Sequence, residues 1–248
     1  MMVACATAGR GLTMDLEAEL REAYNETGAV TNHAIKIEGL QQEIRYLRAG
    51  PQQATKLVIL LHGMAFSAAT WKIVGTLDVL ASAGIQVVAL DLPGYGGEVR
   101  NPEVRRTLLR RFLAAYGWGR KVVIVAASAG GSVGSPYVLS AGNERIAGYV
   151  SVSAVLDDEG FNHSSVPALL VWGELDAPTS GKAKAHERLF STHLMVVMPN
   201  APHPCYLKDP GFFNARLLQF VGGALPSRGE VALKVMANWR PGAVQSEL

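Results

Sequence analysis

Short apolar runs alternate with longer amphipathic segments along most of the chain, and this alternation predicts strands and helices. The runs are continuous rather than alternately polar and apolar, which is typical of strands covered on both faces. Strands are predicted at residues 34–37, 43–47, 56–61, 85–90, 121–127, 149–155, 168–172 and 194–198. Helices are predicted at residues 71–81, 104–116, 133–141, 182–190 and 212–221.

The order of these elements predicts one α/β domain. Strand–helix alternation implies right-handed crossovers and a mostly parallel sheet with helices on both faces. The first two strands follow each other closely and suggest an antiparallel edge. With about eight strands in one sheet, one domain is a better interpretation of 248 residues than two. We expect the domain to span residues 31–224, between an N-terminal extension of 1–30 and a C-terminal extension of 225–248. A short helix is expected within the first extension.

Composition excludes several classes of protein. Hydrophobic residues make up 49% of the chain and charged residues 18%, which argues against a disordered chain. The net charge of +2 is too small to argue for nucleic-acid binding. No apolar run approaches the ~18 residues of a membrane span. The two cysteines, Cys5 and Cys205, fit a reducing compartment and form no disulfide framework. We expect a cytoplasmic protein without metal or cofactor; the nucleus and an organelle transit peptide within residues 1–30 stay open.

A serine ends the apolar run at residues 121–127, and helix-like sequence follows it at once. Ser128 has Ala126 and Gly130 two positions away on either side. This pattern is typical of a nucleophile elbow, in which the serine lies in a strained strand-to-helix turn and these neighbours must be small. Ala126 stands where glycine is more usual. The alternative is a small-residue turn whose serine is incidental.

A serine nucleophile needs a base and an acid that orients the base. In this topology the acid and then the histidine follow the serine along the chain. Asp176 and His203 each come just after a predicted strand. Because the carboxyl ends of parallel strands meet at one edge of a sheet, both project from the same edge as Ser128. We therefore predict a catalytic triad of these three residues. The competing acids are Glu174 and Asp157.

An oxyanion hole is expected beside the serine, because acyl transfer passes through a tetrahedral anion. One donor is the backbone N–H of Ala129, directly after the nucleophile. The other comes from the loop that follows the strand at 56–61, where the N–H of Met64 is the candidate. Gly63 allows the backbone to turn close to a substrate. His62 precedes this turn, and we expect it to shape the loop by hydrogen bonds rather than to act as a base.

The motifs described so far resemble those of the α/β-hydrolase superfamily. Two segments resemble more closely the small abhydrolase-domain-fourteen family: His62-Gly63-Met64-Ala65-Phe66-Ser67 and His203-Pro204-Cys205-Tyr206-Leu207. The resemblance covers roughly residues 33–222. It implies a capless fold, esterase activity on small activated esters, and acyl transfer from acylated lysine to coenzyme A. The chain departs from the family in the Ala-Ala-Ser-Ala-Gly elbow and in Ala65, where a larger polar residue is expected.

The spacing of the strands also bears on the substrate. Only eleven residues separate Val155 from Pro167, where many relatives of this fold insert a helical cap. We therefore expect no cap domain and a shallow site for a small acyl group, or for an acyl group carried on a larger molecule. The predicted pocket walls are Phe66, Phe161, Asn162, His163, Cys205 and Tyr206.

Three hypotheses for function follow. The first is a serine hydrolase that cleaves a small acyl ester or thioester through an acyl-enzyme. The second is an acyltransferase on the same triad, in which coenzyme A replaces water as the acceptor. The third is a non-catalytic ligand-binding protein that keeps the fold, since a fold does not determine function. The sequence leaves the natural acyl group and the oligomeric state open.

Overall fold

The computed structural model describes residues 30–93, 101–140, 144–156, 161 and 163–223, with the backbone alone at 177–182. The predicted extensions therefore lie almost entirely outside the described residues. The strands are β1 (Thr31–Ile35), β2 (Ile44–Ala49), β3 (Leu57–Leu61), β4 (Gln86–Leu90), β5 (Val122–Ala127), β6 (Ile146–Val152), β7 (Ala168–Gly173) and β8 (His193–Met198). The helices are α2 (Ala68–Ile73), α3 (Thr76–Ser82), α4 (Pro102–Tyr116), α5 (Gly131–Leu139), α6 (Ala177–Leu189), α7 (Cys205–Lys208) and α8 (Pro210–Gly222).

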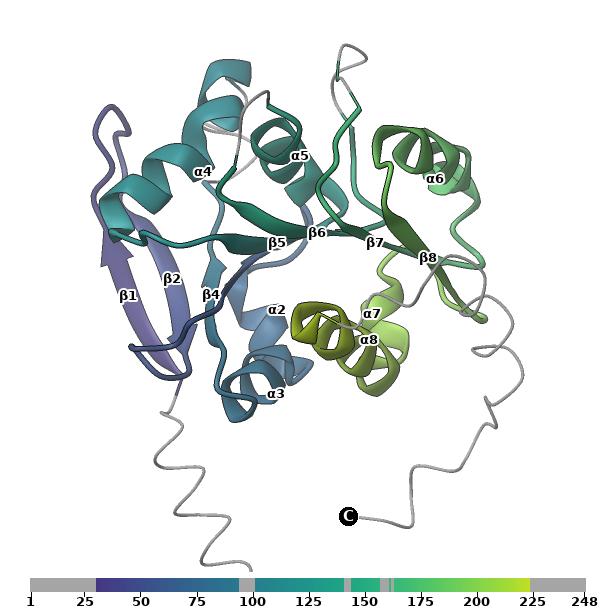
Figure 1. The fold of residues 1–248 in the computed structure, drawn as a ribbon, viewed down its shortest axis with the longest axis horizontal. Coiled ribbons are helices and arrows are strands. Elements are labelled where there is room, and N and C mark those ends of the chain that lie inside the picture. Colours follow the sequence, from purple (N-terminus) through teal and green to yellow (C-terminus); the bar gives the residue numbers. More distant parts are fainter. Residues whose placement is uncertain (1–29, 94–100, 141–143, 157–160, 162, 224–248) are drawn as a thin grey trace, which may run out of the picture.

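The strands form one eight-stranded sheet in the order β1-β2-β4-β3-β5-β6-β7-β8. The pairs β1–β2 and β2–β4 are antiparallel, and the other pairs are parallel. This confirms the predicted mostly parallel sheet with an antiparallel edge. Helices α4, α5 and α6 cover one face, and α2, α3, α7 and α8 cover the other (Figure 1). Among the described residues, no cap domain lies between β6 and β7.

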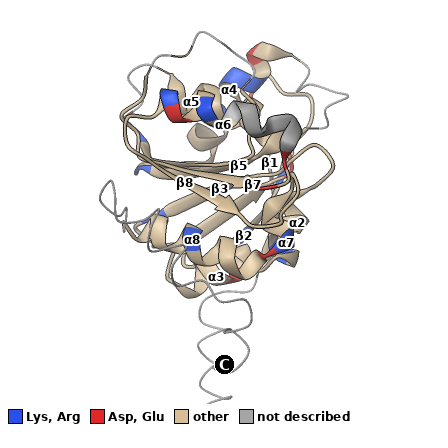
Figure 2. Cartoon of the chain, turned by 90° about the vertical axis from the view of Figure 1, so that its right-hand side faces the viewer, with Lys and Arg blue, Asp and Glu red and all other residues tan. Residues whose placement is uncertain are grey.

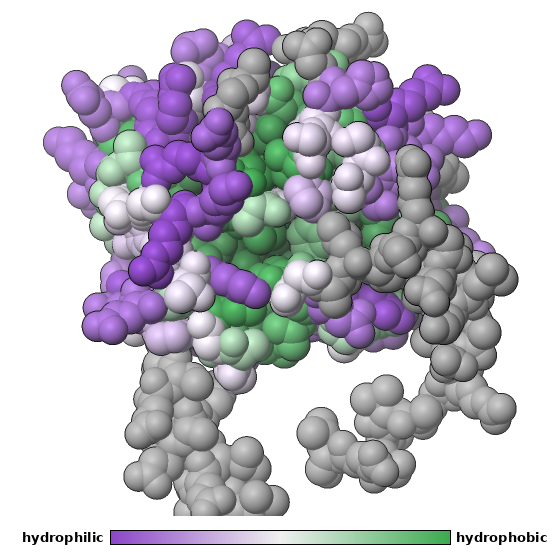
Figure 3. Space-filling view, viewed as in Figure 1, coloured by the Kyte–Doolittle hydropathy of each residue, from purple (hydrophilic) through white to green (hydrophobic). Residues whose placement is uncertain are grey.

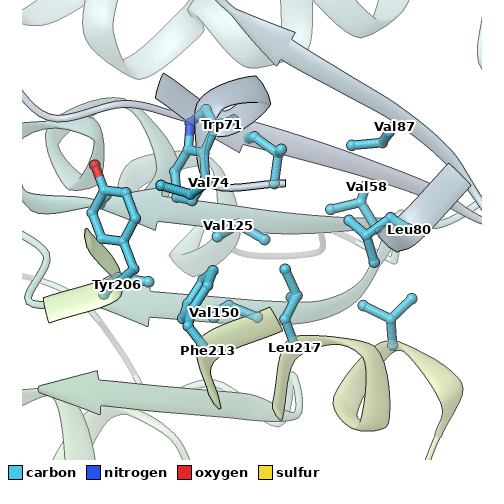
Figure 4. Packing of buried hydrophobic residues seen from close by; sticks show 14 of the residues in the cluster. Val58, Trp71, Val74, Leu80, Val87, Val125, Val150, Tyr206, Phe213 and Leu217 are labelled. Carbon is cyan, nitrogen blue, oxygen red and sulfur yellow. The ribbon is translucent and has the colours of Figure 1, made fainter. Parts of the chain in front are cut away.

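The central strands are buried from end to end, which explains their continuous apolar sequences. Every residue of β3, β4, β5 and β7 is buried. Successive side chains point to opposite faces, so each strand contributes to two separate cores. Val58, Val87, Val125 and Val150 point toward the face that α2, α3, α7 and α8 cover (Figure 4). The alternate residues pack beneath α4, α5 and α6.

Polar residues are distributed as this burial requires. Strands β3 to β8 contain no Lys, Arg, Asp or Glu, and most of these residues lie on the helices and loops (Figure 2). On the face shown in Figure 3, hydrophilic side chains cover the periphery, and hydrophobic side chains reach the surface between the helical layers. Within the described part of the chain, no helix combines the length and the apolar character needed to cross a membrane.

Several local features differ from the sequence prediction: β1 spans Thr31–Ile35 rather than 34–37, and α6 begins at Ala177 rather than at 182. The single helix predicted at 71–81 is two helices, α2 and α3, because Gly75 between them has a left-handed φ of 72°. Strand β6 begins three residues before the predicted position and ends before Ser153, whose φ is 45°. The short helix α7 was not predicted. It begins two residues after His203, in the segment that follows β8, so it contributes to the surroundings of the candidate site.

Candidate active site

The elbow at Ser128 joins β5 to α5 through one short turn of 3₁₀-helix, Ser128–Gly130. Ser128 has a positive φ of 47°, a conformation that costs energy for a residue other than glycine. The turn passes so close to β3 that a Cβ on Gly130 would lie 2.8 Å from the Leu61 carbonyl oxygen. Ala126 is tolerated in place of glycine because α5 presents Gly134 to it; a Cβ on Gly134 would lie 3.0 Å from the Ala126 methyl.

The three residues of the predicted triad lie within hydrogen-bond distance in series. Ser128 Oγ is 2.6 Å from His203 Nε2, and His203 Nδ1 is 2.9 Å from Asp176 Oδ2. The Asp176 side chain is 1% exposed and that of His203 is 37% exposed. Because an ionised carboxylate only accepts, Nδ1 carries the proton and Nε2 accepts from the Ser128 hydroxyl. The His203 ring is therefore accessible from outside, while the Asp176 carboxylate is shielded from water.

The competing acid Glu174 has a different partner. Its Oε2 accepts a hydrogen bond of 2.8 Å from the backbone N–H of Asn200, in the loop that carries His203. The N–H of Leu175 donates to the carbonyl of Ala201 at 2.9 Å in the same region. The loops after β7 and β8 are thus joined to each other, which fixes the separation of acid and histidine. The other competing acid, Asp157, lies outside the described residues.

His62 joins two loops beside the elbow. The Leu92 N–H donates to His62 Nε2 at 3.0 Å, so the proton is on Nδ1, which donates to the Gly63 carbonyl at 2.7 Å. Burial lowers the pKa of His62, partly opposed by the Gly63 hydrogen bond and by Asp91. A neutral ring suits both bonds, because a protonated Nε2 would face the Leu92 N–H donor. His62 therefore holds the loop of the expected oxyanion donor, as the sequence suggests.

Replacing His62 with phenylalanine is expected to destabilise the protein and flatten its pH dependence. At pH 7.5 the loss is about 1–3 kcal/mol, because the Leu92 N–H becomes a buried donor without an acceptor. A lowered folded-state pKa of His62 gives stability that is complete above the unfolded value of 6.5 and is lost as the pH falls below it. Urea unfolding from pH 5 to 8 measures both effects. His163→Gln, at an exposed position, is the control; an equal acid slope in H62F and wild type would contradict this role.

A pocket of about 200 Å³ opens beside the serine, and we call it the Ser128 pocket. It is lined by Gly63, Met64, Ala65, Phe66, Ala127, Ser128, Val152, His203, Pro204 and Tyr206. A Cβ on Gly63 would lie 3.3 Å from the Ser128 Cβ, so the loop after β3 approaches Ser128 closely. The loop, the elbow and the histidine segment therefore meet around one small cavity.

Comparison with known proteins agrees with the fold. The sequence profile of the alpha/beta hydrolase family matches residues 58–245. This chain belongs to the α/β-hydrolase family. It is 36% identical over 185 residues to "Protein ABHD14A" of Danio rerio. The aligned region covers 70% of this chain and 67% of that protein. It is 34% identical over 199 residues to "Putative protein-lysine deacylase ABHD14B" of Homo sapiens. This alignment covers 76% of this chain and 94% of that protein.

Solved structures agree on the fold of this α/β-hydrolase. A CIB-like hydrolase of Thermoplasma acidophilum superposes with a TM-score of 0.68 at 20% sequence identity, over 79% of this chain and 99% of that chain. The carboxylesterase CesB of Bacillus subtilis superposes with a TM-score of 0.64 at 18% identity, over 84% of this chain and 100% of that chain. At these identities the likeness concerns the fold alone.

Several predicted wall residues of the α/β-hydrolase are not among those that line its pocket. Cys205 is fully buried, and burial raises the pKa of its thiol to about 12. Phe161 packs against the core on the opposite face of the sheet. His163 is exposed elsewhere, and Asn162 lies outside the described residues. These positions were proposed from their nearness in sequence to strand ends, which does not determine the direction of a side chain.

Other wall residues were missed by the sequence analysis. Ala65, Ala127, Val152 and Pro204 line the pocket. Val152 ends β6, next to β5 at the edge of the sheet that carries Ser128, but the strand predicted at 149–155 placed that end at Val155. Pro204 directly follows the histidine. Among the described residues, no group of three or more His, Cys, Asp or Glu side chains is arranged to hold a metal ion.

Proposed function

We propose that this α/β-hydrolase is a serine hydrolase that cleaves a small acyl ester or thioester through an acyl-enzyme intermediate. The observation that carries the proposal is the hydrogen-bonded series from Ser128 Oγ through the His203 ring to the buried Asp176 carboxylate. Nucleophile, base and orienting acid in this arrangement activate a serine that is otherwise a weak nucleophile. The adjoining pocket of about 200 Å³ supports a small acyl group.

In the proposed reaction, Ser128 Oγ attacks the carbonyl carbon while His203 Nε2 takes the hydroxyl proton. Asp176 stabilises the resulting imidazolium. The backbone N–H groups of Ala129 and Met64 stabilise the tetrahedral oxyanion. His203 then donates its proton to the leaving alkoxide or thiolate, which leaves the acyl group on Ser128. A water molecule, deprotonated by the same ring, attacks the acyl carbon and releases the acid and the free serine.

Labelling with a fluorophosphonate tests the nucleophile directly. Ser128 Oγ is expected to displace fluoride from phosphorus and form a stable adduct, which mass spectrometry locates on the peptide that contains Ser128. The variant Ser128→Ala is expected to fold as the wild type does and to give no adduct. Circular dichroism of both proteins checks their folding. No adduct on well-folded wild type would refute the hydrolase and favour a ligand-binding protein of this fold.

Lysine deacylation is a second candidate, supported by the identity to ABHD14B, whose name describes it as a protein-lysine deacylase. The same acyl-enzyme forms when the leaving group is a lysine amine, to which His203 donates the proton. The acceptor in the second half of the reaction is then either water or the thiol of coenzyme A. Adding coenzyme A to a reaction with an acylated lysine peptide distinguishes these acceptors, because only transfer yields an acyl thioester.

A further inference from the structure

The Ser128 pocket is lined mostly by apolar side chains. Apart from Ser128 and His203, its described lining residues are glycine, alanine, valine, methionine, proline, phenylalanine and tyrosine. The tyrosine, Tyr206, presents only its ring to the pocket, because its hydroxyl oxygen is fully buried. An acyl group on Ser128 therefore meets apolar surface along its chain, with Ser128 and His203 at its carbonyl end.

A negative charge lies behind one wall of this pocket. The buried Asp176 carboxylate is 2.9 Å from Nδ1 of His203, which is a lining residue. Water and salt screen a buried charge much less than a surface charge. No lysine or arginine is among the described residues that line the pocket. The proposed mechanism adds positive charge to His203 alone, and Asp176 already balances that charge. The site therefore suits an acyl group without charge.

A carboxylate at the end of an acyl chain is placed unfavourably in such a pocket. Moving an ionised carboxylate out of water costs far more than moving a neutral group, unless a cation or hydrogen-bond donors compensate for it. No described lining residue has a cationic or amide side chain. A cavity of ~150 Å³ holds a molecule the size of benzene, so the pocket of about 200 Å³ holds an acyl chain of about six carbons. The carboxylate of a short dicarboxylic chain, such as succinyl, therefore lies inside it.

Ala65 is the lining residue at which the structure leaves room for a compensating charge. It is exposed, and it lies in a turn that the Phe66 N–H closes by donating to the Gly63 carbonyl at 3.0 Å. Because backbone atoms hold this turn, a longer side chain at position 65 extends along the mouth of the pocket without entering the core. In the natural sequence this position has a single methyl group, which carries no charge and leaves the mouth open.

We propose that the Ser128 pocket selects uncharged alkanoyl groups against acyl groups that end in a carboxylate, and that Ala65 is the specificity-determining residue. The inference rests on the proposed function and names its substrate class. Propanoyl and butanoyl groups are accepted, whereas malonyl, succinyl and glutaryl groups are rejected. Members of the two classes can have the same size and shape, so the selection is electrostatic rather than steric.

Two boronic acids of equal size test this selection. Boron takes the place of the acyl carbon: Ser128 Oγ adds to boron, the hydroxyl proton passes to His203 Nε2, and a tetrahedral borate results. The chain of (3-methylbutyl)boronic acid ends in an isopropyl group, and in 3-boronopropanoic acid a carboxylate of the same shape replaces this group. The measured quantity is the concentration of each compound that halves the rate of fluorophosphonate labelling of Ser128. The ratio of the two concentrations reports the selection by charge.

We expect wild type to bind the carboxylated compound about 100-fold more weakly than its isopropyl partner, or weaker still, because the carboxylate is buried without a countercharge. Ala65→Arg is expected to reduce this ratio about 10- to 100-fold, as for a new charge-assisted hydrogen bond. Ala65→Met adds a long neutral side chain at the same position. Ala114→Arg adds the same charge at an exposed position of α4 that is not among the lining residues. Both controls are expected to keep the ratio within about threefold of wild type.

Similar binding of the two boronic acids by wild type would overturn the inference and leave the hydrolase intact. Protection of Ser128 by neither compound would also overturn it, because the pocket would then reject short chains of both kinds. Equal ratios in A65R and A114R would overturn the role of Ala65. Circular dichroism checks folding, and Ala65→Lys replaces A65R if that variant does not fold. Absence of any fluorophosphonate adduct on well-folded wild type would overturn the proposed function itself, so the two failures are distinguishable.

Discussion

Asp176→Asn is expected to lower the turnover of an activated ester by about 10⁴-fold without unfolding the protein. In the wild type, Asp176 Oδ2 lies 2.9 Å from His203 Nδ1 and accepts a hydrogen bond from its N–H. An asparagine amide can present its NH₂ group to Nδ1 instead, which favours the tautomer with the proton on Nε2. That ring cannot take the proton of Ser128, although every side chain is still in place. Steady-state kinetics with p-nitrophenyl acetate measure the loss.

Glu174→Gln is the matched control for this experiment. It makes the same chemical change two residues earlier in the same loop. A carboxamide oxygen can still accept from the Asn200 N–H, which is the bond that Glu174 makes at 2.8 Å. We expect turnover within about threefold of wild type. A loss near 10⁴-fold in E174Q, with D176N still active, would transfer the role of orienting acid to Glu174.

Gly131→Ala is expected to cost about 3 kcal/mol or more in the free energy of unfolding, at the upper end of overpacking effects. Gly131 has ordinary helical angles, with φ −60° and ψ −33°, so backbone conformation does not require glycine there. Glycine is required there by lack of space, because an added Cβ would lie 2.3 Å from the Val155 carbonyl oxygen and 2.7 Å from the Val155 nitrogen. The Val155 N–H also donates to the Ser128 carbonyl at 2.9 Å, so the elbow is displaced as well.

Urea unfolding compares this variant with Gly222→Ala. A Cβ on Gly222, in the last turn of α8, would meet no described atom within 4 Å. That substitution is expected to be neutral or to stabilise by up to about 1 kcal/mol, since alanine restricts the unfolded chain. The expected contrast is a lower midpoint with an unchanged m-value in G131A alone. Equal midpoints would show that the elbow yields to an extra methyl group.

The continuous apolar runs made the central strands predictable. A strand such as β3, with five buried residues in succession, has few alternatives in a chain that also contains amphipathic segments. Parallel crossovers then bring the carboxyl ends of β5, β7 and β8 to one edge of the sheet, although they do not determine the order of the strands. Ser128, Asp176 and His203 were therefore predictable as neighbours, because each directly follows a buried strand and their order along the chain suits the fold.

Features that depend on side-chain direction or on local backbone angles were not predictable. Residues 71–81 have an unbroken helical pattern, and only the left-handed φ of Gly75 divides them. Cys205 and Tyr206 are adjacent in sequence, yet Tyr206 lines the Ser128 pocket and Cys205 does not. In the short helix α7 consecutive side chains diverge, and packing against Trp71 decides which one faces the cavity.

The order of the strands along the chain has a consequence for when the protein becomes reactive during its synthesis and folding. His203 follows β8, which is the last strand among the described residues and pairs there only with β7 at the edge of the sheet. Ser128 precedes His203 by 75 residues, so it is synthesised first. In the proposed mechanism, the serine has no base until β8 pairs with β7, and it is unreactive until then. Non-local parallel pairing is slow, so the emergence of nucleophilic reactivity marks the end of folding rather than its beginning.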